Sequence, residues 1–487
     1  MRHLKTAATA LCVCILLSLA TPFAAAVDFP YVKAASAVLA DMDSGIILYE
    51  KNMNERRSPA SLTKIMTGLL AVEALERGDV ALDDVIAAPR DCWEGMDLDS
   101  SNAEILPGEE LTFKDYLYCA MVKSANEACN VIAVAVDGSI QAFVNHMNLR
   151  ANELGARNTF FSDTNGLSNE NHYTTAYDLF LITNEAMKHE IFVDAVNTID
   201  YEIEATDMHE KRYLNSSNAL LCQDGAYGDG YLYLPASGVK TGYTKAAGYC
   251  LVSTAEKDGK RLLAVVLGCG GVLNTGEDGY GNFQATINMY DWGFKNFQFV
   301  TVLAAGETLN RAPVKYAKDN RTAELKSAGE IRLLLPKDID ENRIGIKIEL
   351  MENRLAAPIK TGATLGTATV TVDGKKYAEV RLYCAEDIDA DVKQLMLAKA
   401  VELLSEPGPR YTVLAVISLI AIIVIVIIRF ESGKKRHARE ISEAEERRRY
   451  EQEQQRRQES TEADRLRVVQ YRKELENSER EEKDNGT

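Results

Sequence analysis

One segment near the C-terminus restricts the possible folds of this chain more than any other. Residues 413–428 are all Val, Leu, Ile or Ala except for Ser418. With its flanking residues, the run reaches the roughly 18 residues that a helix needs to cross a membrane. A buried core helix is the alternative, but a run this uniformly apolar, placed between Pro409 and a basic cluster, favours the bilayer. We therefore predict a transmembrane helix over residues 411–429.

Charged residues at both ends of the chain set the expected topology. A basic cluster at positions 434, 435, 436 and 439 follows the apolar run, and such clusters stay on the cytoplasmic side. At the N-terminus, Arg2 and Lys5 precede an apolar stretch and a small-residue site at Ala24-Ala25-Ala26, the pattern of a secretory signal. We expect a signal peptide over residues 1–26, a single-pass anchor in the cell membrane, and the bulk of the chain outside.

The C-terminal tail, residues 430–487, is expected to be cytoplasmic. It is dense in Glu, Arg, Gln and Lys and shows no sustained apolar heptad, so a coiled coil is not supported. A solvated helix with interleaved charges, or disorder, is favoured over a dedicated binding module.

Three short motifs, in order along the chain, carry the groups for one kind of chemistry. They are Ser61-Leu62-Thr63-Lys64, Ser124-Ala125-Asn126 and Lys240-Thr241-Gly242. Together they provide a nucleophilic hydroxyl, an amine that can take its proton, a polar pair that can relay the proton, and a cation that can hold a carboxylate.

The first motif lies where a helix is expected to begin. Ser58 can cap this helix, Pro59 suits its first turn, and apolar residues then recur at helical spacing. Ser61 would lie in the first turn, with Lys64 three residues later on the same face.

Each motif also occurs elsewhere in the chain. We interpret these further copies as helix caps, turns or solvated basic clusters, since short motifs recur by chance in a chain of 487 residues. The further copies are Ser432-Gly433-Lys434-Lys435, Ser100-Ser101-Asn102, Ser216-Ser217-Asn218 and Lys360-Thr361-Gly362.

The longer sequence segments around the motifs at Ser61, Ser124 and Lys240 resemble those of the serine D-alanyl-D-alanine carboxypeptidases of peptidase family S11, the low-molecular-mass penicillin-binding proteins. The resemblance covers about residues 34–297 and is carried by residues 58–67, 123–128, 171–178, 238–244 and 247–252. It implies the penicillin-recognising fold shared by serine DD-peptidases and β-lactamases. The active site is then expected in the cleft between a sheet and a helical block.

The resemblance also implies a role for each motif residue. Ser61 would be the nucleophile and Lys64 its general base, if burial and the nearby cation Lys240 keep the Lys64 amine neutral. Ser124 would relay a proton to the leaving amine, and Asn126 would orient the base and the substrate.

The strand motif would bind the end of the substrate. Lys240 and Thr241 are expected to hold the terminal carboxylate, and Gly242 to let the substrate backbone approach the strand. The backbone amides of Ser61 and Tyr243 would stabilise the oxyanion. His172 is expected to have a structural hydrogen-bonding role, and Asn165-Gly166 to form a turn.

The order of elements predicts an α+β fold. Strands on both sides of Asp43-Ser44-Gly45 and of Asp258-Gly259 bracket a helical block, and a helix over residues 283–297 closes the unit. Residues 298–388 alternate like a small all-β module, which resembles the accessory domain that follows the catalytic domain in this family. Residues 389–410 form a helix-like linker to the membrane.

Composition excludes several other classes of function. The net charge of −17 argues against nucleic-acid binding. No Cys-x-x-Cys pair or His-rich cluster indicates a metal, and neither a metal nor an organic cofactor is expected. Seven cysteines follow the signal peptide, and since they are odd in number and scattered through apolar segments, we expect mostly free thiols.

The predicted function is membrane-anchored removal of the terminal D-alanine from peptidoglycan pentapeptides, with acylation of the same serine by β-lactams. A serine β-lactamase shares the motifs, but no Glu-x-x-x-Asn segment matches the deacylating loop of the class A enzymes, and the accessory domain and membrane span fit a cell-wall enzyme better. A cross-link endopeptidase and a β-lactam-sensing membrane receptor also remain open. Intact catalytic motifs and a tail without a globular core argue against the receptor.

Overall fold

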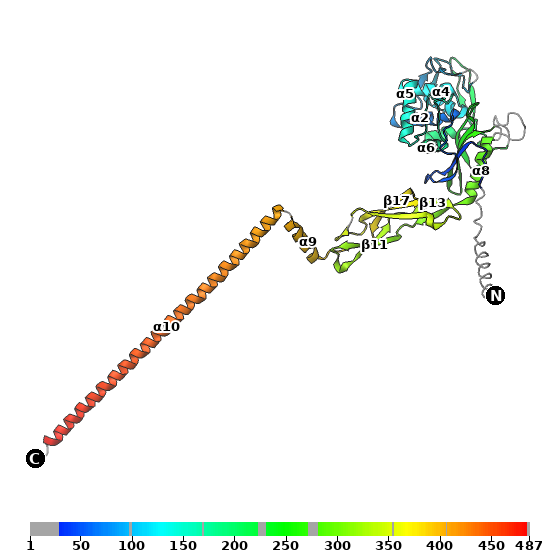
Figure 1. Cartoon of the computed structure of the whole chain (residues 1–487). Helices are drawn as coiled ribbons and strands as arrows, with labels where there is room; N and C mark the ends of the chain where they lie inside the picture. The colour runs from blue at the N-terminus through cyan, green and yellow to red at the C-terminus, as the bar shows by residue number, and fades with distance from the viewer. Residues whose placement is uncertain are drawn as a thin grey trace, which may run out of the picture. The chain divides into compact units, whose positions relative to one another are not determined.

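The computed structural model describes residues 29–96, 100–167, 170–222, 230–270, 281–352, 355–405 and 407–484 (Figure 1). The predicted signal peptide over residues 1–26 lies outside these ranges. The chain divides into two compact units, one containing most of residues 29–387 and one containing the C-terminal helices.

The N-terminal part of the first unit is built on an antiparallel five-stranded sheet in the order β2-β1-β9-β8-β7. Its first strand pairs with one that comes more than 200 residues later, Val38 opposite Val265, as the α+β prediction requires. Both predicted hairpins are confirmed. The strands are β1 (Ser36–Asp41), β2 (Ile47–Lys51), β7 (Ala236–Thr244), β8 (Gly248–Lys257) and β9 (Lys260–Cys269).

Most of the regular elements between β2 and β7 are helices, and α2, α4, α5 and α6 gather in one cluster (Figure 1). These elements are η1 (Ala60–Thr63), α2 (Lys64–Arg77), α3 (Phe113–Tyr118), the π-helical turn η2 (Cys119–Lys123), α4 (Asn126–Asp137), α5 (Ile140–Glu153), α6 (Ala176–Ala186) and α7 (Glu190–Asn197). Two short antiparallel strand pairs, which the sequence did not predict, interrupt the helical block: β3 (Val85–Ala87) with β4 (Glu110–Thr112), and β5 (Asp200–Ile203) with β6 (Arg212–Asn215).

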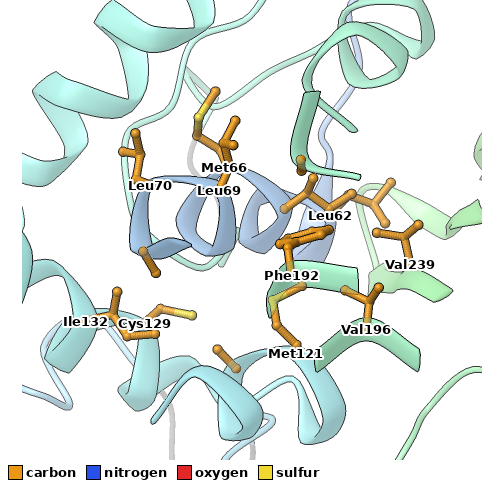
Figure 2. Packing of buried hydrophobic residues seen from close by; sticks show 14 of the residues in the cluster. Leu62, Met66, Leu69, Leu70, Met121, Cys129, Ile132, Phe192, Val196 and Val239 are labelled. Carbon is orange, nitrogen blue, oxygen red and sulfur yellow. The ribbon is translucent and has the colours of Figure 1, made fainter. Parts of the chain in front are cut away.

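Helix α2 is the centre of the core. Leu62, Met66, Leu69 and Leu70 pack against residues from α4, α7, η2 and β7, as Figure 2 shows. The packing is close enough that a Cβ on Gly68 would lie 2.8 Å from the ring of Phe192. Because α2 packs against neighbouring elements on several sides, its position is fixed. The residues at its N-terminal end are therefore held in place as well.

Helix α8 (Gly281–Asn296) covers the opposite face of the sheet. Successive side chains of a strand point to opposite faces, and the core around α2 contains Val38 but not Leu39. A Cβ on Gly293 of α8 would lie 2.8 Å from the Leu39 side chain, so α8 packs on the face that α2 does not.

The start of α2 differs from the prediction in one respect. Ser58 does not cap the helix: the chain enters the 3₁₀ turn η1 through Pro59, whose φ and ψ of −76° and −20° are already helical. Among the described residues, the buried Ser58 hydroxyl has no hydrogen-bond partner. Contacts of η1 with β7 and β8, rather than a side-chain cap, hold the start of this helix.

The predicted all-β module follows α8. It contains a two-stranded sheet, β10-β13, and a six-stranded sheet in the order β14-β16-β17-β12-β11-β15, which confirms the alternating pattern read from the sequence. The elements are β10 (Phe297–Leu303), β11 (Thr308–Lys315), η3 (Lys318–Asn320), β12 (Thr322–Ser327), β13 (Ile331–Pro336), η4 (Glu341–Arg343), β14 (Ile344–Leu350), β15 (Leu355–Ala356), β16 (Thr364–Val372) and β17 (Lys375–Cys384).

The C-terminal unit contains two helices, together with Val314–Arg321 and Ala356–Ile359. The helices are α9 (Val392–Ser405) and α10 (Pro407–Asp484). Within α10 the stretch Tyr411–Glu476 contains a window of mean hydropathy 3.2, long and apolar enough to cross a membrane, and its side chains are exposed. Helix α10 continues through the charged tail to Asp484. Of the two predicted alternatives, a solvated helix and disorder, the described part of the tail therefore shows the helix.

Candidate active site

The three motifs meet around one cavity of about 140 Å³ at the N-terminal end of α2. Ser61 comes from η1, Ser124 from the residue after η2, and Thr241, Gly242 and Tyr243 from β7. Ser61 Oγ lies 3.1 Å from Lys64 Nζ, the geometry expected for residues three apart at the start of a helix. The predicted site residues therefore converge, although they are far apart in the sequence.

Lys64 is fully buried and surrounded by oxygen atoms. Its Nζ donates hydrogen bonds to Asn126 Oδ1 at 2.7 Å and to the backbone carbonyl of Asn165 at 2.9 Å. Burial lowers the pKa of Lys64, although Cys129, Asp163 and Glu127 act in the opposite direction. A neutral amine has two hydrogens and one lone pair. Because the two carbonyl oxygens can only accept, they take both hydrogens, and the lone pair faces the Ser61 hydroxyl.

Ser124 follows η2 in the left-handed conformation, with φ of +65°, which is uncommon for a residue other than glycine. Its side chain is buried and lines the cavity, and among the described residues its hydroxyl has no hydrogen-bond partner. A buried hydroxyl without a partner costs free energy, so this strained position is suited to a group that bonds with substrate.

Lys240 is also buried, on β7. Burial first, and then the charge of Lys64, lower the pKa of Lys240 to about 7. Its Nζ lies 3.3 Å from the carbonyl oxygen of Thr241. An anion that enters the cavity would therefore meet a cation with little other compensation.

Gly242 has a packing role besides the predicted approach of the substrate backbone, which stays a prediction. In the structure a Cβ at Gly242 would lie 3.1 Å from the Pro59 carbonyl oxygen, 3.3 Å from Ala60 Cβ and 3.3 Å from the Leu62 amide nitrogen. The glycine thus lets β7 pack directly against the turn that carries Ser61.

Two of the motif copies that were interpreted as chance matches also reach the cavity. Ser101 and Ser217, the middle residues of Ser100-Ser101-Asn102 and Ser216-Ser217-Asn218, both line it. Ser217 Oγ lies 2.5 Å from Thr241 Oγ1, which fixes the rotamer of a residue expected to contact the substrate. The signal for these residues was present in the sequence, but nothing in it distinguished them from turns.

The cavity has an apolar side that the sequence analysis did not identify. Tyr243 and Tyr249, opposite each other on β7 and β8, have ring centroids 4.5 Å apart, and Phe283 from α8 lines the same cavity. Lys123 and Asn282 complete the lining. A ligand in this cavity would meet hydroxyls on one side and aromatic rings on the other.

The expectations for His172 and Asn165 are confirmed with an addition. His172 is buried and bonds to Thr63 Oγ1 at 2.8 Å and to the Ser162 backbone, a structural role. Asn165-Gly166 forms a tight bend, with Gly166 at φ of +91°, but the Asn165 carbonyl also holds Lys64. A backbone carbonyl has no signature in the sequence, so this contact could not have been predicted.

In the part of the chain that the structure describes, no group of three or more His, Cys, Asp or Glu side chains has the arrangement of a metal site. Free thiols are present at Cys92, Cys119, Cys129, Cys250, Cys269 and Cys384, all of them buried, which agrees with the predicted behaviour of small apolar residues.

Comparison with known proteins gives a consistent result. Residues 23–271 match the family model described as D-alanyl-D-alanine carboxypeptidase, and residues 297–390 match the C-terminal domain of penicillin-binding protein 5. The chain is 36% identical to D-alanyl-D-alanine carboxypeptidase DacF of Bacillus subtilis over 357 residues, covering 73% of this chain and 86% of the relative. It is 30% identical to DacA of Escherichia coli, covering 74% and 84%.

Solved structures show the same likeness. Penicillin-binding protein 5 from Haemophilus influenzae superposes with a TM-score of 0.59 at 27% identity, covering 74% of this chain and 99% of that one. The matched region includes both the sheet-and-helix part and the all-β module.

Proposed function

Because the chain belongs to the D-alanyl-D-alanine carboxypeptidases of peptidase family S11, and is a carboxypeptidase of that class, we propose a mechanism in which Ser61 forms an acyl-enzyme with the peptidoglycan stem. The observation that carries the proposal is the surroundings of Lys64. Its two hydrogens are taken by Asn126 and Asn165, which leaves the lone pair for the Ser61 proton.

Acylation begins as Ser61 Oγ attacks the carbonyl carbon of the penultimate D-alanine. Lys64 accepts the hydroxyl proton as the new C–O bond forms, because an unassisted serine hydroxyl is a weak nucleophile. The backbone amides of Ser61 and Tyr243, two residues that line the cavity, stabilise the oxyanion.

Collapse of the tetrahedral intermediate breaks the C–N bond and releases the last D-alanine. The proton held by Lys64 passes to the leaving nitrogen through the Ser124 hydroxyl, which has no partner among the described residues. A water molecule then attacks the ester, with the same lysine as base, and restores the free serine. β-Lactams acylate the same oxygen by opening their ring amide.

Recognition of the substrate terminus depends on β7. The buried Lys240 binds the terminal carboxylate together with the Thr241 hydroxyl, which Ser217 orients. Binding of the anion favours the charged form of Lys240, whose pKa of about 7 in the free enzyme leaves it easily protonated. This requirement for a free carboxylate restricts the enzyme to the end of a peptide.

The activity test is D-alanine release by the full-length protein from a pentapeptide that ends in D-Ala-D-Ala, beside the same peptide ending in L-Ala. We expect release from the first only, and no release by Ser61→Ala. Rapid hydrolysis of penicillin without D-alanine release would indicate a β-lactamase. Cleavage of cross-linked dimers alone would indicate an endopeptidase, and stable acylation with neither activity would indicate a sensor.

We also propose that α10 anchors the chain, with residues 411–429 across the membrane and the tail after residue 430 in the cytoplasm. The support is the exposed apolar stretch and the basic residues that follow it. Protease added to wall-stripped cells should digest the N-terminal part while an epitope after Glu440 survives. Release of the full-length mature protein by alkaline carbonate would contradict a span.

A further inference from the structure

We propose that Asp163 and His172 position the amine of Lys64 for proton transfer. They fix the loop over residues 162–167, whose Asn165 carbonyl holds that amine, against the turn that carries the nucleophile. The inference rests on the proposed role of Lys64 as general base.

The loop is held internally by Asp163. Its Oδ1 accepts hydrogen bonds from the backbone amides of Asn165 at 3.0 Å and Gly166 at 2.6 Å. These two bonds set the direction of the peptide group that carries the Asn165 carbonyl. That carbonyl accepts from Lys64 Nζ at 2.9 Å, so the carboxylate determines where one hydrogen of the amine points.

His172 joins the loop to the nucleophile turn. Its Nδ1 lies 3.2 Å from the Ser162 amide nitrogen and 3.4 Å from Asp163 Oδ2, and its Nε2 lies 2.8 Å from Thr63 Oγ1. The Thr63 hydroxyl in turn donates to the Ala60 carbonyl at 2.9 Å. Thr63 and Ala60 belong to η1, the same four-residue turn that contains Ser61.

The contact between the loop and the turn leaves no spare space. A Cβ at Gly166 would lie 1.9 Å from the Ala60 carbonyl oxygen and 2.8 Å from Thr63 Oγ1. The histidine side chain itself has no exposed surface. A displacement of the loop is therefore transmitted to the turn, and the separation between Ser61 Oγ and Lys64 Nζ depends on both.

Asp163 also has an electrostatic effect on the base. Burial opposes its ionisation, but hydrogen bonding with His172 and with the two loop amides keeps the pKa of Asp163 below its ordinary value. The resulting negative charge favours protonated Lys64, as do Cys129 and Glu127 from α4, while burial favours the neutral amine. Among the described residues, the remaining charged group that acts on Lys64 is Lys240 on β7.

The first test uses Asp163→Asn in the full-length protein, because the amide retains an oxygen that can accept from the loop but removes the charge. The rate of acylation by a fluorescent penicillin is measured against pH. Losing one nearby anion makes Lys64 easier to deprotonate, so the rising limb should move to lower pH by roughly one unit. The matched control is Asp137→Asn, which removes the carboxylate of another His–Asp pair, at 2.9 Å from His146 and at the far end of α4.

The second test separates positioning from folding at His172. His172→Ala should slow acylation by about 10-fold or more at the pH optimum, since small misplacements of catalytic groups are costly. His172→Gln retains one donor and one acceptor and should recover most of this loss. Circular dichroism and thermal melting report whether each variant is folded, and if Asp163→Asn is not, this pair alone decides the question.

If the wild-type enzyme is acylated normally by penicillin, two results would overturn the inference. One is a pH profile of Asp163→Asn that coincides with those of the wild type and Asp137→Asn. The other is equal acylation by folded His172→Ala and His172→Gln. Failure of the wild type itself to acylate at Ser61 would instead reject the proposed function.

Discussion

The tripeptide Lys-Thr-Gly occurs twice in this chain, and the two copies differ in almost every physical property. Lys240 is 2% exposed, whereas the side chain of Lys360 is 75% exposed and pairs with Asp387 at 2.8 Å. Burial lowers the pKa of Lys240 to about 7, while the Lys360 ion pair lowers the pKa of Asp387. The lysine of the first copy has no carboxylate partner among its described contacts, and that of the second copy has one.

The threonines and glycines differ in the same way. Thr241 bonds to Ser217 in the cavity, whereas the hydroxyl and the amide of Thr361 are both held by Asp387, at 2.9 and 2.8 Å. Gly242 is pressed against the turn before α2, while Gly362 has φ of +81° and open space around it. The comparison teaches that the surroundings of the motif decide what it can do, because the same three residues form a buried strand beside the cavity in one place and an exposed turn in another.

The largest expected difference between the two copies is in substrate recognition. Lys240→Ala should lower kcat/KM for a peptide ending in D-Ala-D-Ala by about 100-fold or more, since it leaves the substrate carboxylate buried without its cation. Lys360→Ala should change it less than about twofold, because an exposed pair contributes little. The measurement is D-alanine release from the free acid and D-alaninamide release from the same peptide with a terminal carboxamide. On the carboxamide the wild type and Lys240→Ala should become similar.

A second difference should appear when the glycines are replaced. Gly242→Ala must displace the turn that carries Ser61 by a few tenths of an ångström, so acylation should fall by roughly 10-fold. Gly362→Ala should leave acylation unchanged and destabilise the all-β module by about 1 kcal/mol, the cost of a side chain in the left-handed region. Acylation rates and thermal melting of both variants would show whether the two losses separate in this way.

A third difference concerns the pH dependence of stability. Between about pH 7, the pKa of folded Lys240, and its ordinary value of 10.5, the unfolded chain binds a proton that the folded chain does not. Stability therefore rises with pH across this window, by up to about 1.4 kcal/mol per pH unit, and the contribution levels off below about pH 7, where both states are protonated. Lys240→Met should remove this contribution.

The check is a series of melting curves of the wild type, Lys240→Met and Lys360→Met between pH 7 and 10. The stability of Lys240→Met relative to the wild type should be greatest near pH 7 and decline as pH rises. Lys360→Met should run parallel to the wild type. Parallel curves for both variants would mean that Lys240 is charged in the folded protein at neutral pH.

The smallest expected effect is at Asp387. Because the pKa of Asp387 is lowered, its ionised form stabilises the fold at pH values above the ordinary pKa of a carboxyl group. This contribution is lost as the pH falls through the pKa of folded Asp387. Asp387→Asn should lower the melting temperature slightly at low salt and hardly at all in about 1 M salt, where an exposed pair is screened. D-alanine release should stay at the wild-type level. A loss of activity in this variant would contradict the assignment of the second copy to a turn.

Much of the fold and of the candidate site could be predicted, because these features depend on side-chain types and on their spacing in the sequence. The i, i+3 placement of Ser61 and Lys64 follows from helix geometry. Turn residues identified two hairpins of the five-stranded sheet, and alternating residues identified the all-β module. The contrast between the two Lys-Thr-Gly copies was also accessible, since Lys360 follows a proline and precedes a strand in a turn-rich region.

What could not be predicted depends on backbone groups and on distant packing. The Asn165 carbonyl that holds Lys64 has no signature in the sequence, and the pairing of Ser217 with Thr241 depends on how β6 and β7 are brought together. The error at Ser58 has a similar cause: the capping rule uses local sequence alone, and the start of this helix is held by its contacts with β7 and β8. Local patterns predicted the elements, and tertiary packing decided which groups reach the cavity.

The central claim is that Ser61, with Lys64 as its base, forms the acyl-enzyme. The most direct measurement is intact-mass and peptide-mapping analysis of the full-length protein after reaction with penicillin. We predict one added penicillin per chain, located on the peptide that contains Ser61. Labelling should be absent in Ser61→Ala and slowed by roughly 1000-fold in folded Lys64→Ala. Undiminished labelling of Ser61→Ala, or a label on any other residue, would contradict the account.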